Sequence, residues 1–410
     1  MKLSIMYILS QNHLDHEEVM NQIENDRLTK VGPNTPGGNM LRRYWWPIAL
    51  ASDVGVDPVP VRILGEDLVL FRTLEGNLGL LNRRCAHRGA SLQYGRIEGN
   101  GIRCCYHGWL FDLQGKCLDQ PCEPGNGLNK EHIQQKAYLA KELSGFIFGY
   151  LGPLPAPQIP QYDLLADQDL HKVVMGRDGH SNWFQRAENM MDALHVLCLH
   201  STLYPELAMQ LPTRTEYLDK WYGYQIELDY PNGTKDRHHV MFPAINRIQI
   251  ARAGQESFQF IQWCVPIDDT KSVLYQLWAT KAEKDQGTIK PAKFQKTTPH
   301  EYVRVEDGWW KIWERDQDDA AIDSQGVIAD RSDEHLANCD IGIVKFRRAI
   351  KQSISAVESG QDPAGLIRPG DEHDGFIDLS SWKTELNVEP GKIRAPEVGA
   401  KIKVIAPHDF

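Results

Sequence analysis

The sequence predicts an α+β protein in which an all-β domain precedes a domain whose strands are bracketed by helices. In residues 44–149, short alternating runs such as 59–64 are separated by Gly- and Asn-containing turns, a pattern typical of many short strands. A proline-rich segment at 152–157 then interrupts the pattern, and such stiff segments suit a domain boundary. Long strand candidates follow between two helical segments, which indicates an α+β layered domain.

The proline-rich segment divides the 410 residues into two predicted domains. The first, 1–156, contains an N-terminal helix expected from His13 to Arg27 and the all-β region. The second, 157–410, is expected to start with a helix near 183–200 and to contain a later helix from about Asp340 to Val357. Between these helices the strand candidates are 222–230, 237–252, 257–266 and 271–283.

The formal net charge of −10 argues against a protein that binds nucleic acid through its overall field. Apolar runs stay well short of the ~18–20 residues that a membrane-spanning helix needs. We therefore expect a protein of the cytoplasm that associates with neither nucleic acid nor membrane.

A local group of cysteines and histidines predicts a metal site in the first domain. Cys85 and His87 are followed, after sixteen residues, by Cys104 and His107, with Cys105 beside them. Two thiolates on one iron and two imidazoles on the other are the ligands of a Rieske [2Fe–2S] cluster. A Cys₂His₂ zinc site would use the same residue types. The arrangement of one Cys and one His on each of two loops favours the cluster.

A second constellation lies in the expected helix near 183–200. His195 and His200 are five residues apart, and at 100° per residue a regular helix would separate them by about 140°. The helix must therefore widen or end between them if both bind one ion. Two histidines and one carboxylate on one face of an iron leave positions open for O₂ and substrate.

These motifs resemble those of the Rieske non-haem iron oxygenases, in particular the oxygenase (alpha) components of the phthalate dioxygenase-like branch. The resemblance rests on the following segments: Cys85-Ala86-His87-Arg88-Gly89-Ala90, Cys104-Cys105-Tyr106-His107-Gly108-Trp109, Asp192-Ala193-Leu194-His195-Val196-Leu197-Cys198-Leu199-His200 and Leu41-Arg42-Arg43-Tyr44-Trp45-Trp46-Pro47. The family usually has proline where Cys105 stands, so that Cys105 could also supply a Cys-x-His pair. By analogy Cys104 is the expected ligand. The implied fold is a Rieske domain followed by a helix-grip catalytic domain with an antiparallel sheet.

The resemblance also implies roles for residues around the mononuclear Fe(II). His195 and His200 are the expected histidine ligands, and Asp340, which opens the later helix, is the expected carboxylate. An N-terminal cap is its alternative role, and the nearby acids Asp330, Asp333 and Glu334 are rival ligands. Asp192 and Asn189 are the expected catalytic residues. In the family, the aspartate at the position of Asp192 hydrogen-bonds a cluster histidine of a neighbouring subunit, which implies a homotrimer or stacked trimers.

The implied reaction uses O₂ and electrons from NADH or NADPH, delivered by a separate reductase and in some systems a ferredoxin. The implied substrate is an aromatic carboxylic acid, such as phthalate, phenoxybenzoate, vanillate or dehydrodivanillate, that is hydroxylated or O-demethylated. Arg247 and Arg252 are the expected partners of its carboxylate. Further pocket candidates are His238, His239, Phe258, Trp263 and Trp278. The alternatives are a neutral aromatic substrate, a non-catalytic electron carrier and a ligand-binding helix-grip protein.

Overall fold

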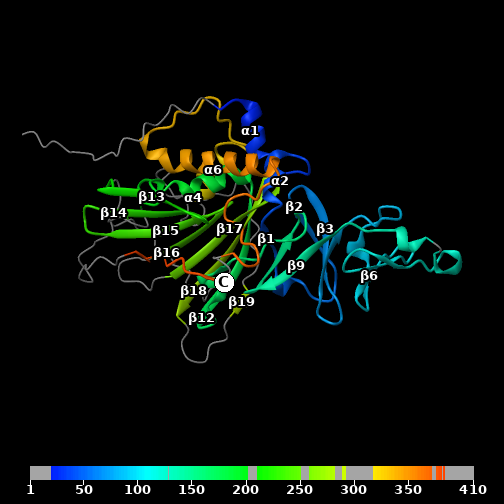
Figure 1. Ribbon diagram of the computed structural model, residues 1–410. Coiled ribbons are helices and arrows are strands. Elements are labelled where there is room, and N and C mark those ends of the chain that lie inside the picture. The colour runs from blue at the N-terminus through cyan, green and yellow to red at the C-terminus, as the bar shows by residue number, and fades with distance from the viewer. Residues whose placement is uncertain are drawn as a thin grey trace, which may run out of the picture.

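A computed structural model describes residues 20–127, 129–201, 210–250, 258–281, 289–291, 317–371, 375–380 and 382–383. Two sheet-rich regions follow one another along the chain, as the sequence predicts (Figure 1). The α+β class is confirmed. Residues 1–19, and with them the first part of the predicted N-terminal helix, lie outside the described residues.

A six-stranded sheet and a four-stranded sheet form the first region. In sheet order, the six strands are Trp45–Leu50 (β1), Phe146–Tyr150 (β10), Ala137–Leu143 (β9), Leu78–Asn82 (β4), Glu66–Arg72 (β3) and Val59–Ile63 (β2). The four are Arg96–Glu98 (β5), Gly101–Arg103 (β6), Leu110–Asp112 (β7) and Cys117–Asp119 (β8). Figure 1 shows β6 at the end of the molecule away from helices α4 and α6.

A nine-stranded sheet dominates the second region. Its strands, in sheet order, are Arg214–Lys220 (β13), Gly223–Asp229 (β14), Lys235–Met241 (β15), Ile245–Ile250 (β16), Phe258–Asp268 (β17), Lys271–Lys281 (β18), Leu170–Gly179 (β12) and Ile289–Pro291 (β19), with Trp382–Lys383 (β21) paired to β15. Gln161–Tyr162 (β11) and Phe376–Ile377 (β20) form a separate parallel pair.

Helices cover one face of the large sheet, where Figure 1 shows α4 and α6. The α-helices are Gln22–Thr29 (α1), Pro36–Leu41 (α2), Asp163–Ala166 (α3), Trp183–Met191 (α4), Gln317–Asp323 (α5) and Ile341–Glu358 (α6). Short 3₁₀ turns occur at Ala51–Asp53 (η1), Leu92–Tyr94 (η2), Pro124–Asn126 (η3), Lys130–His132 (η4), His195–Leu197 (η5) and Asn338–Asp340 (η8). Among the described helices, none has both the length and the apolar character of a membrane span.

The N-terminal helices pack against the second region although they precede the first in sequence. Asn25 donates to the carbonyl of Ala329 at 3.0 Å and accepts from Arg331 at 2.9 Å. Arg27 of α1 forms an ion pair with Glu358 of α6 at 2.6 Å. The division at residue 156 therefore stays a prediction, and the segment before β1 is part of the packing of the second region.

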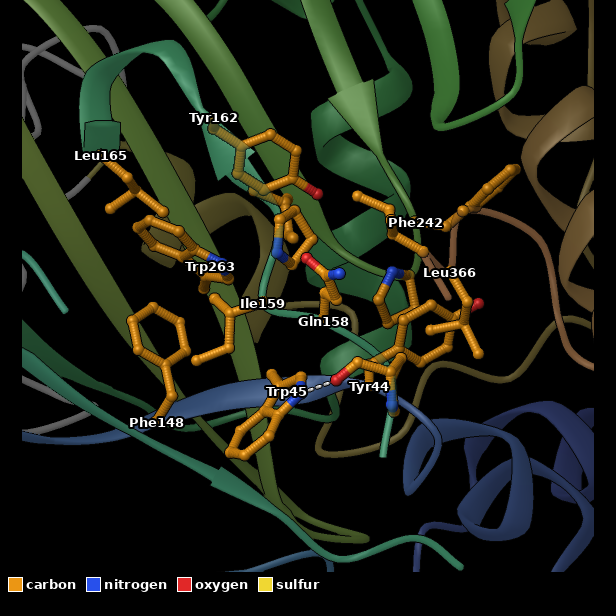
Figure 2. Close-up of a pocket in the computed structure, with 16 residues that line it drawn as sticks. Tyr44, Trp45, Phe148, Gln158, Ile159, Tyr162, Leu165, Phe242, Trp263 and Leu366 are labelled. Atoms are coloured by element: carbon orange, nitrogen blue, oxygen red, sulfur yellow. Dashed lines mark hydrogen bonds between the residues drawn. The ribbon is translucent and has the colours of Figure 1, made fainter. Parts of the chain in front are cut away.

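Alternation along the strands gives the large sheet two chemically different faces. Cys264 of β17 contacts the Trp183 carbonyl of α4, whereas its neighbour Trp263 lies against Phe146 and Phe148 of the first region. Since side chains alternate along a strand, these contacts define a helix face and an opposite face. On the opposite face a cavity of about 20 Å³ lies among Trp45, Phe148 and Trp263 (Figure 2), which is room for about one water molecule and not for a substrate.

Two details of the second region differ from the prediction. The strand expected over 237–252 is wrong as a single strand: it is two antiparallel strands, β15 and β16, with Phe242, Pro243 and Ala244 between them. Pro243 has no N–H for a sheet ladder and ends β15. Several further elements of this region were not predicted, among them the strands β12 and β13 and the helix α5.

Candidate metal centres

Two loops with the same backbone hydrogen bonds carry the cysteines and histidines of the first region. In each loop the cysteine N–H donates to the carbonyl of the residue five positions later. The distance is 2.9 Å from Cys85 to Ala90 and 2.8 Å from Cys104 to Trp109. The N–H of the glycine four residues on, Gly89 or Gly108, donates back to the cysteine carbonyl. Both glycines have φ +73°, a conformation that disfavours other residues. The loops therefore place Cys85 and Cys104 at equivalent positions.

This equivalence bears on the choice between Cys104 and Cys105. Cys104 is buried with Cys85 in a small apolar core that also contains Trp109, whereas Cys105 is exposed. A thiol that faces the other loop is suited to bind a shared metal group. The structure therefore favours Cys104, as expected from the sequence.

The four donor side chains are grouped by type. Cys85 and Cys104 are buried in the same small core and the Cys104 thiol influences the pKa of Cys85, while the ring centroids of His87 and His107 lie 4.6 Å apart. Among the described residues, however, no three of these donors lie within 4.8 Å of one another. Ligands of one tetrahedral zinc ion would all lie within roughly 4 Å of one another. Two separate pairs fit a two-iron cluster with a thiolate end and an imidazole end.

Two local features fit such a group. His87 stacks on Trp109 with 4.3 Å between ring centroids, and its Nδ1 atom is buried without a hydrogen-bond partner. A buried ring nitrogen without a partner is costly unless it binds a metal. Burial is the main cause that raises the pKa of Cys85 to about 12, so its thiolate form needs a nearby positive charge such as iron.

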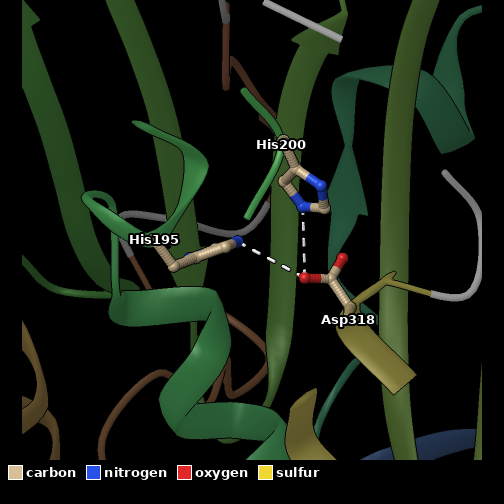
Figure 3. A group of neighbouring side chains, drawn as sticks. All are labelled: His195, His200 and Asp318. Atoms are coloured by element: carbon tan, nitrogen blue, oxygen red, sulfur yellow. Dashed lines mark ion pairs between the residues drawn. The ribbon is translucent and has the colours of Figure 1, made fainter. Parts of the chain in front are cut away.

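A second group of donors lies in the second region (Figure 3). The Nε2 atoms of His195 and His200 point at one carboxylate oxygen of Asp318, at 3.4 Å and 3.2 Å. Two metal bonds of about 2.1 Å at near right angles would place their donor atoms about 3 Å apart. His195, His200 and Asp318 therefore have the spacing of a two-histidine, one-carboxylate metal site. We call these three residues the triad.

The chain leaves the α-helix before it reaches the histidines. Helix α4 ends at Met191, and His195 starts the 3₁₀ turn η5. The Oδ1 atom of Asp192 accepts from the N–H groups of Leu194 at 3.1 Å and His195 at 3.2 Å, which stabilises this turn. Helix α4 therefore ends before either histidine, and not between them. The irregular backbone that follows aims both rings at Asp318.

Hydrogen bonds to the Nδ1 atoms orient both rings. His200 Nδ1 lies 2.7 Å from the Gln317 side-chain oxygen, and His195 Nδ1 contacts the Asp192 carbonyl. Such contacts hold the proton on Nδ1 and leave Nε2 as the metal ligand. Asn189 donates to Asp318 at 3.5 Å, so this predicted residue lies beside the triad.

The charges of the triad support one another. Burial alone would raise the pKa of Asp318, but hydrogen bonds and charges of His195 and His200 outweigh it and hold this pKa well below 3.8. Burial likewise opposes the charged form of His195, yet Asp318 raises the His195 pKa to about 8. A carboxylate held between two imidazole rings, at 3.4 Å and 3.2 Å, is also suited to a divalent cation.

Buried ion pairs fix the position of helix α5. Arg186 of α4 bonds Asp319 at 2.6 Å and Asp323 at 2.7 Å, and Arg177 of β12 bonds Asp319 at 2.5 Å. Breaking such a buried pair costs roughly 3–5 kcal/mol. With Asp319 held by arginines, the preceding Asp318 is presented to the histidines.

Asp340 does not lie with the histidines, so the predicted third ligand is wrong. Its carboxylate accepts from the Ala337 N–H at 2.7 Å, at the start of η8 and α6. Asp340 stands at the N-cap position of α6, but its carboxylate makes no capping hydrogen bond to that helix and instead accepts from the residue before η8, as in a capping box. Asp318 takes the place expected of Asp340. Acidic residues at the start of a short Ala- and Ile-containing segment were the available signal for α5.

The role predicted for Arg247, as a partner of the substrate carboxylate, is also corrected by the structure. It pairs with Ile261 and therefore belongs to the face of Trp263, opposite the helices. There it is buried and bonds Asp163 at 2.9 Å. His239 and Trp263 share this opposite face, whereas His238, Phe258 and Trp278 lie on the helix face. Arg252 lies outside the described residues.

Comparison with known proteins agrees with this architecture. Residues 44–138 match the family model of the Rieske [2Fe-2S] domain. The chain is 37% identical over 367 residues to the phenoxybenzoate dioxygenase subunit alpha of Ectopseudomonas oleovorans, which covers 83% of this chain and 87% of that one. It is 33% identical over 356 residues to the 5,5'-dehydrodivanillate O-demethylase oxygenase subunit of a Sphingobium strain, covering 84% and 83%.

Solved structures show the same fold. The terminal oxygenase of carbazole 1,9a-dioxygenase from Novosphingobium sp. KA1 superposes with a TM-score of 0.60 at 20% identity, covering 81% of this chain and 98% of that chain. Pseudomonas putida CBB5 NdmA with caffeine gives a TM-score of 0.63 at 20% identity, covering 82% and 98%.

A cluster-binding β domain joined to a sheet with a two-histidine, one-carboxylate site defines an iron-dependent oxygenase. The chain belongs to the Rieske non-haem iron oxygenases, as an oxygenase (alpha) component of the phthalate dioxygenase-like branch. Its cofactors are one [2Fe–2S] cluster and one mononuclear iron, its co-substrate is O₂, and its electrons come from a separate redox partner.

Proposed function

We propose that this oxygenase hydroxylates or O-demethylates an aromatic carboxylic acid. The observation that supports this proposal most directly is the triad. An ion bound by His195, His200 and Asp318 would keep coordination positions open on one side, and an electron carrier would not need such positions. The relatives named for phenoxybenzoate and dehydrodivanillate, at 37% and 33% identity, support the substrate class.

We assign the cluster to Cys85, Cys104, His87 and His107, and the mononuclear iron to the triad. When bound, the iron activates O₂ with electrons that reach it from the cluster. The protein residues around it hold the ligands: Gln317 orients His200, the carbonyl of Asp192 orients His195, and Asn189 contacts Asp318.

For a methoxy acid the overall reaction is balanced by one O₂ and two electrons. One oxygen atom is inserted into a methyl C–H bond, and the other leaves as water with two protons. The resulting hemiacetal breaks its C–O bond and yields a phenol and formaldehyde. Without a methoxy group, attack on the ring yields a hydroxylated product.

The assembly in this proposal is a homotrimer, or stacked trimers, in the cytoplasm. Figure 1 shows the four-stranded sheet that carries the second cluster loop projecting at the end of the molecule away from α4, which supports electron transfer between subunits rather than within one. Asp192 uses its Oδ1 atom and its carbonyl within its own chain. Its Oδ2 atom lies 4.0 Å from His195 Nδ1, and the side chain is 27% exposed, so that it can also meet His87 or His107 of a neighbouring subunit. The donor is a reductase, with or without a ferredoxin.

The test is a turnover screen with a surrogate reductase and NADH. Phthalate, 3-phenoxybenzoate, 4-hydroxy-3-methoxybenzoate and their methyl esters are supplied, and O₂ uptake, formaldehyde and ring products are measured. We expect at least one acid to be oxidised faster than its ester. Oxidation of the esters or of unsubstituted arenes alone would reject the acid and favour a neutral substrate. Arg247 faces away from the triad, so Arg247→Met should leave the acid's KM unchanged.

A further inference from the structure

The helix face of the large sheet carries three side-chain amides in a row across neighbouring strands. Asn246 of β16 pairs with Gln262 of β17, and Gln262 pairs with Gln276 of β18. Directly paired residues of antiparallel strands project from the same face with Cβ atoms about 4.5–5.5 Å apart. We call Asn246, Gln262 and Gln276 the amide row.

The amide row faces the elements that carry the triad. Cys264, two residues after Gln262 and on the same face, contacts α4. On β12, Arg177 shares this face and bonds Asp319, the residue next to Asp318. Figure 3 shows the triad in front of the strands of the sheet. A substrate bound at the triad would therefore have the amide row as one wall.

A chain of hydrogen bonds orients the amides. The Nε1 atom of Trp278 donates to the side-chain oxygen of Gln276 at 3.2 Å, and Gln276 Nε2 donates to the side-chain oxygen of Gln262 at 2.5 Å. Because its oxygen is taken, Gln262 presents its Nε2 group as a donor. Beside it, the Oδ1 atom of Asn246 is buried and has no hydrogen-bond partner. A donor and an unsatisfied acceptor thus stand at adjacent positions.

Aromatic side chains adjoin the amide row on the same face. Phe260 and Trp278 pack at 4.7 Å between ring centroids, and Phe258 lies 6.4 Å from Trp278. Val173 and Met175 of β12 complete a small apolar cluster with Trp278. An aromatic ring against this surface would place a ring substituent at the amides.

The chemistry of the amide row selects among possible substituents. A hydroxyl group can accept from Gln262 and donate to Asn246 at once, whereas an ether or a carboxylate can only accept. A buried carboxylate also needs a cation, and Arg177, a described cation of this face, is already paired with Asp319. A neutral hydroxyl leaves no buried group of the amide row unsatisfied.

We propose that the amide row binds a phenolic hydroxyl group of the substrate, so that the enzyme prefers aromatic acids that carry a ring hydroxyl. This proposal rests on the proposed function, since it names the recognised group at the same site. The carboxylate of the substrate then lies at another wall of the site.

The test measures binding rather than turnover. Dissociation constants are determined by calorimetry on the oxygenase loaded with both metals, without reductase and under anaerobic conditions. The probes are 4-hydroxy-3-methoxybenzoate, 3-methoxy-4-methylbenzoate and 3,4-dimethoxybenzoate, which differ only at the 4-position. We expect the hydroxyl compound to bind about ten-fold more tightly than the other two, which corresponds to ~1.4 kcal/mol.

Gln262→Leu and Asn246→Leu should reduce this preference to within about two-fold by weakening the hydroxyl compound alone. Gln249→Leu is the matched control, because Gln249 lies on the opposite face of β16, and it should keep the preference. Unchanged cluster spectra and iron content show that the variants are folded.

Three results would overturn the proposal, and they differ in what else they reject. Tight binding of all three probes without preference by the wild type rejects the hydroxyl contact alone. Equal weakening of all three by the amide-row variants replaces it with carboxylate binding at the row. No binding of any probe rejects it together with the aromatic-acid function.

Discussion

The two metal centres are built in opposite ways. The cluster loops take their four donors from two short segments, each closed by its own backbone hydrogen bonds. The triad takes its histidines from the turn after α4, but its carboxylate comes from α5, where Gln317 follows His200 by 117 residues. Local hydrogen bonds shape the first centre, whereas the packing of distant helices assembles the second. Removal of one donor residue should therefore disrupt only the centre to which that residue belongs.

The largest expected effect is at the cluster. Cys104→Ser should remove the visible absorption of the cluster and abolish turnover, because serine replaces a buried thiolate ligand. Cys105→Ser is the matched control: Cys105 is exposed, and the cluster spectrum should stay as in the wild type. If the two variants behave the other way round, the equivalence of the two loops is not the basis of ligand choice.

Removal of the carboxylate should empty the second centre alone. Asp318→Ala should lower mononuclear iron binding on the order of 100-fold or more and stop substrate oxidation, while the cluster spectrum is retained. Asp340→Ala should keep the iron and cost only about 1 kcal/mol of unfolding free energy, as loss of one hydrogen bond does. Iron analysis and denaturant unfolding measure both. Loss of iron in Asp340→Ala with retention in Asp318→Ala would restore the sequence-based ligand.

The connection between the centres is tested at Asp192. Asp192→Asn keeps the carbonyl that contacts His195 and an oxygen for the turn, so both metals should stay. Oxidation of the reduced cluster by O₂ with substrate present should slow about ten- to hundred-fold, because the variant loses the charge of the link that we propose between subunits. Stopped-flow absorbance of the cluster measures this rate. A rate near that of the wild type would show that Asp192 serves the turn only.

The smallest effect concerns the orientation of one ligand. Gln317→Leu removes the acceptor for His200 Nδ1 and should weaken iron binding about ten-fold. Gln317→Glu keeps an acceptor and should restore most of the affinity. Equilibrium dialysis with Fe(II) distinguishes the variants, and the cluster spectrum is the internal control. If Gln317→Leu binds iron as tightly as the wild type, the His200 ring is oriented by packing instead.

Family membership could be predicted from the sequence, and the cluster ligands that we assign could be proposed from it, because these signals are contiguous. Cys85, His87, Cys104 and His107 lie in two short loops, and the glycines at positive φ enforce the same turn in each. The histidine spacing also predicted correctly that a regular helix could not aim both rings at one ion, although α4 ends before His195.

Tertiary structure alone decided which carboxylate meets the histidines and which strand residues face them. Asp318 and Asp340 both begin helical segments, and local sequence cannot distinguish them. The choice comes from the buried pairing of Asp319 with Arg177 and Arg186, which fixes α5 over the sheet. Likewise, Arg247 looked suited to an anion, but the strand register turns it to Asp163. A sequence determines local turns through its own hydrogen bonds, whereas distant side chains are brought together only by packing.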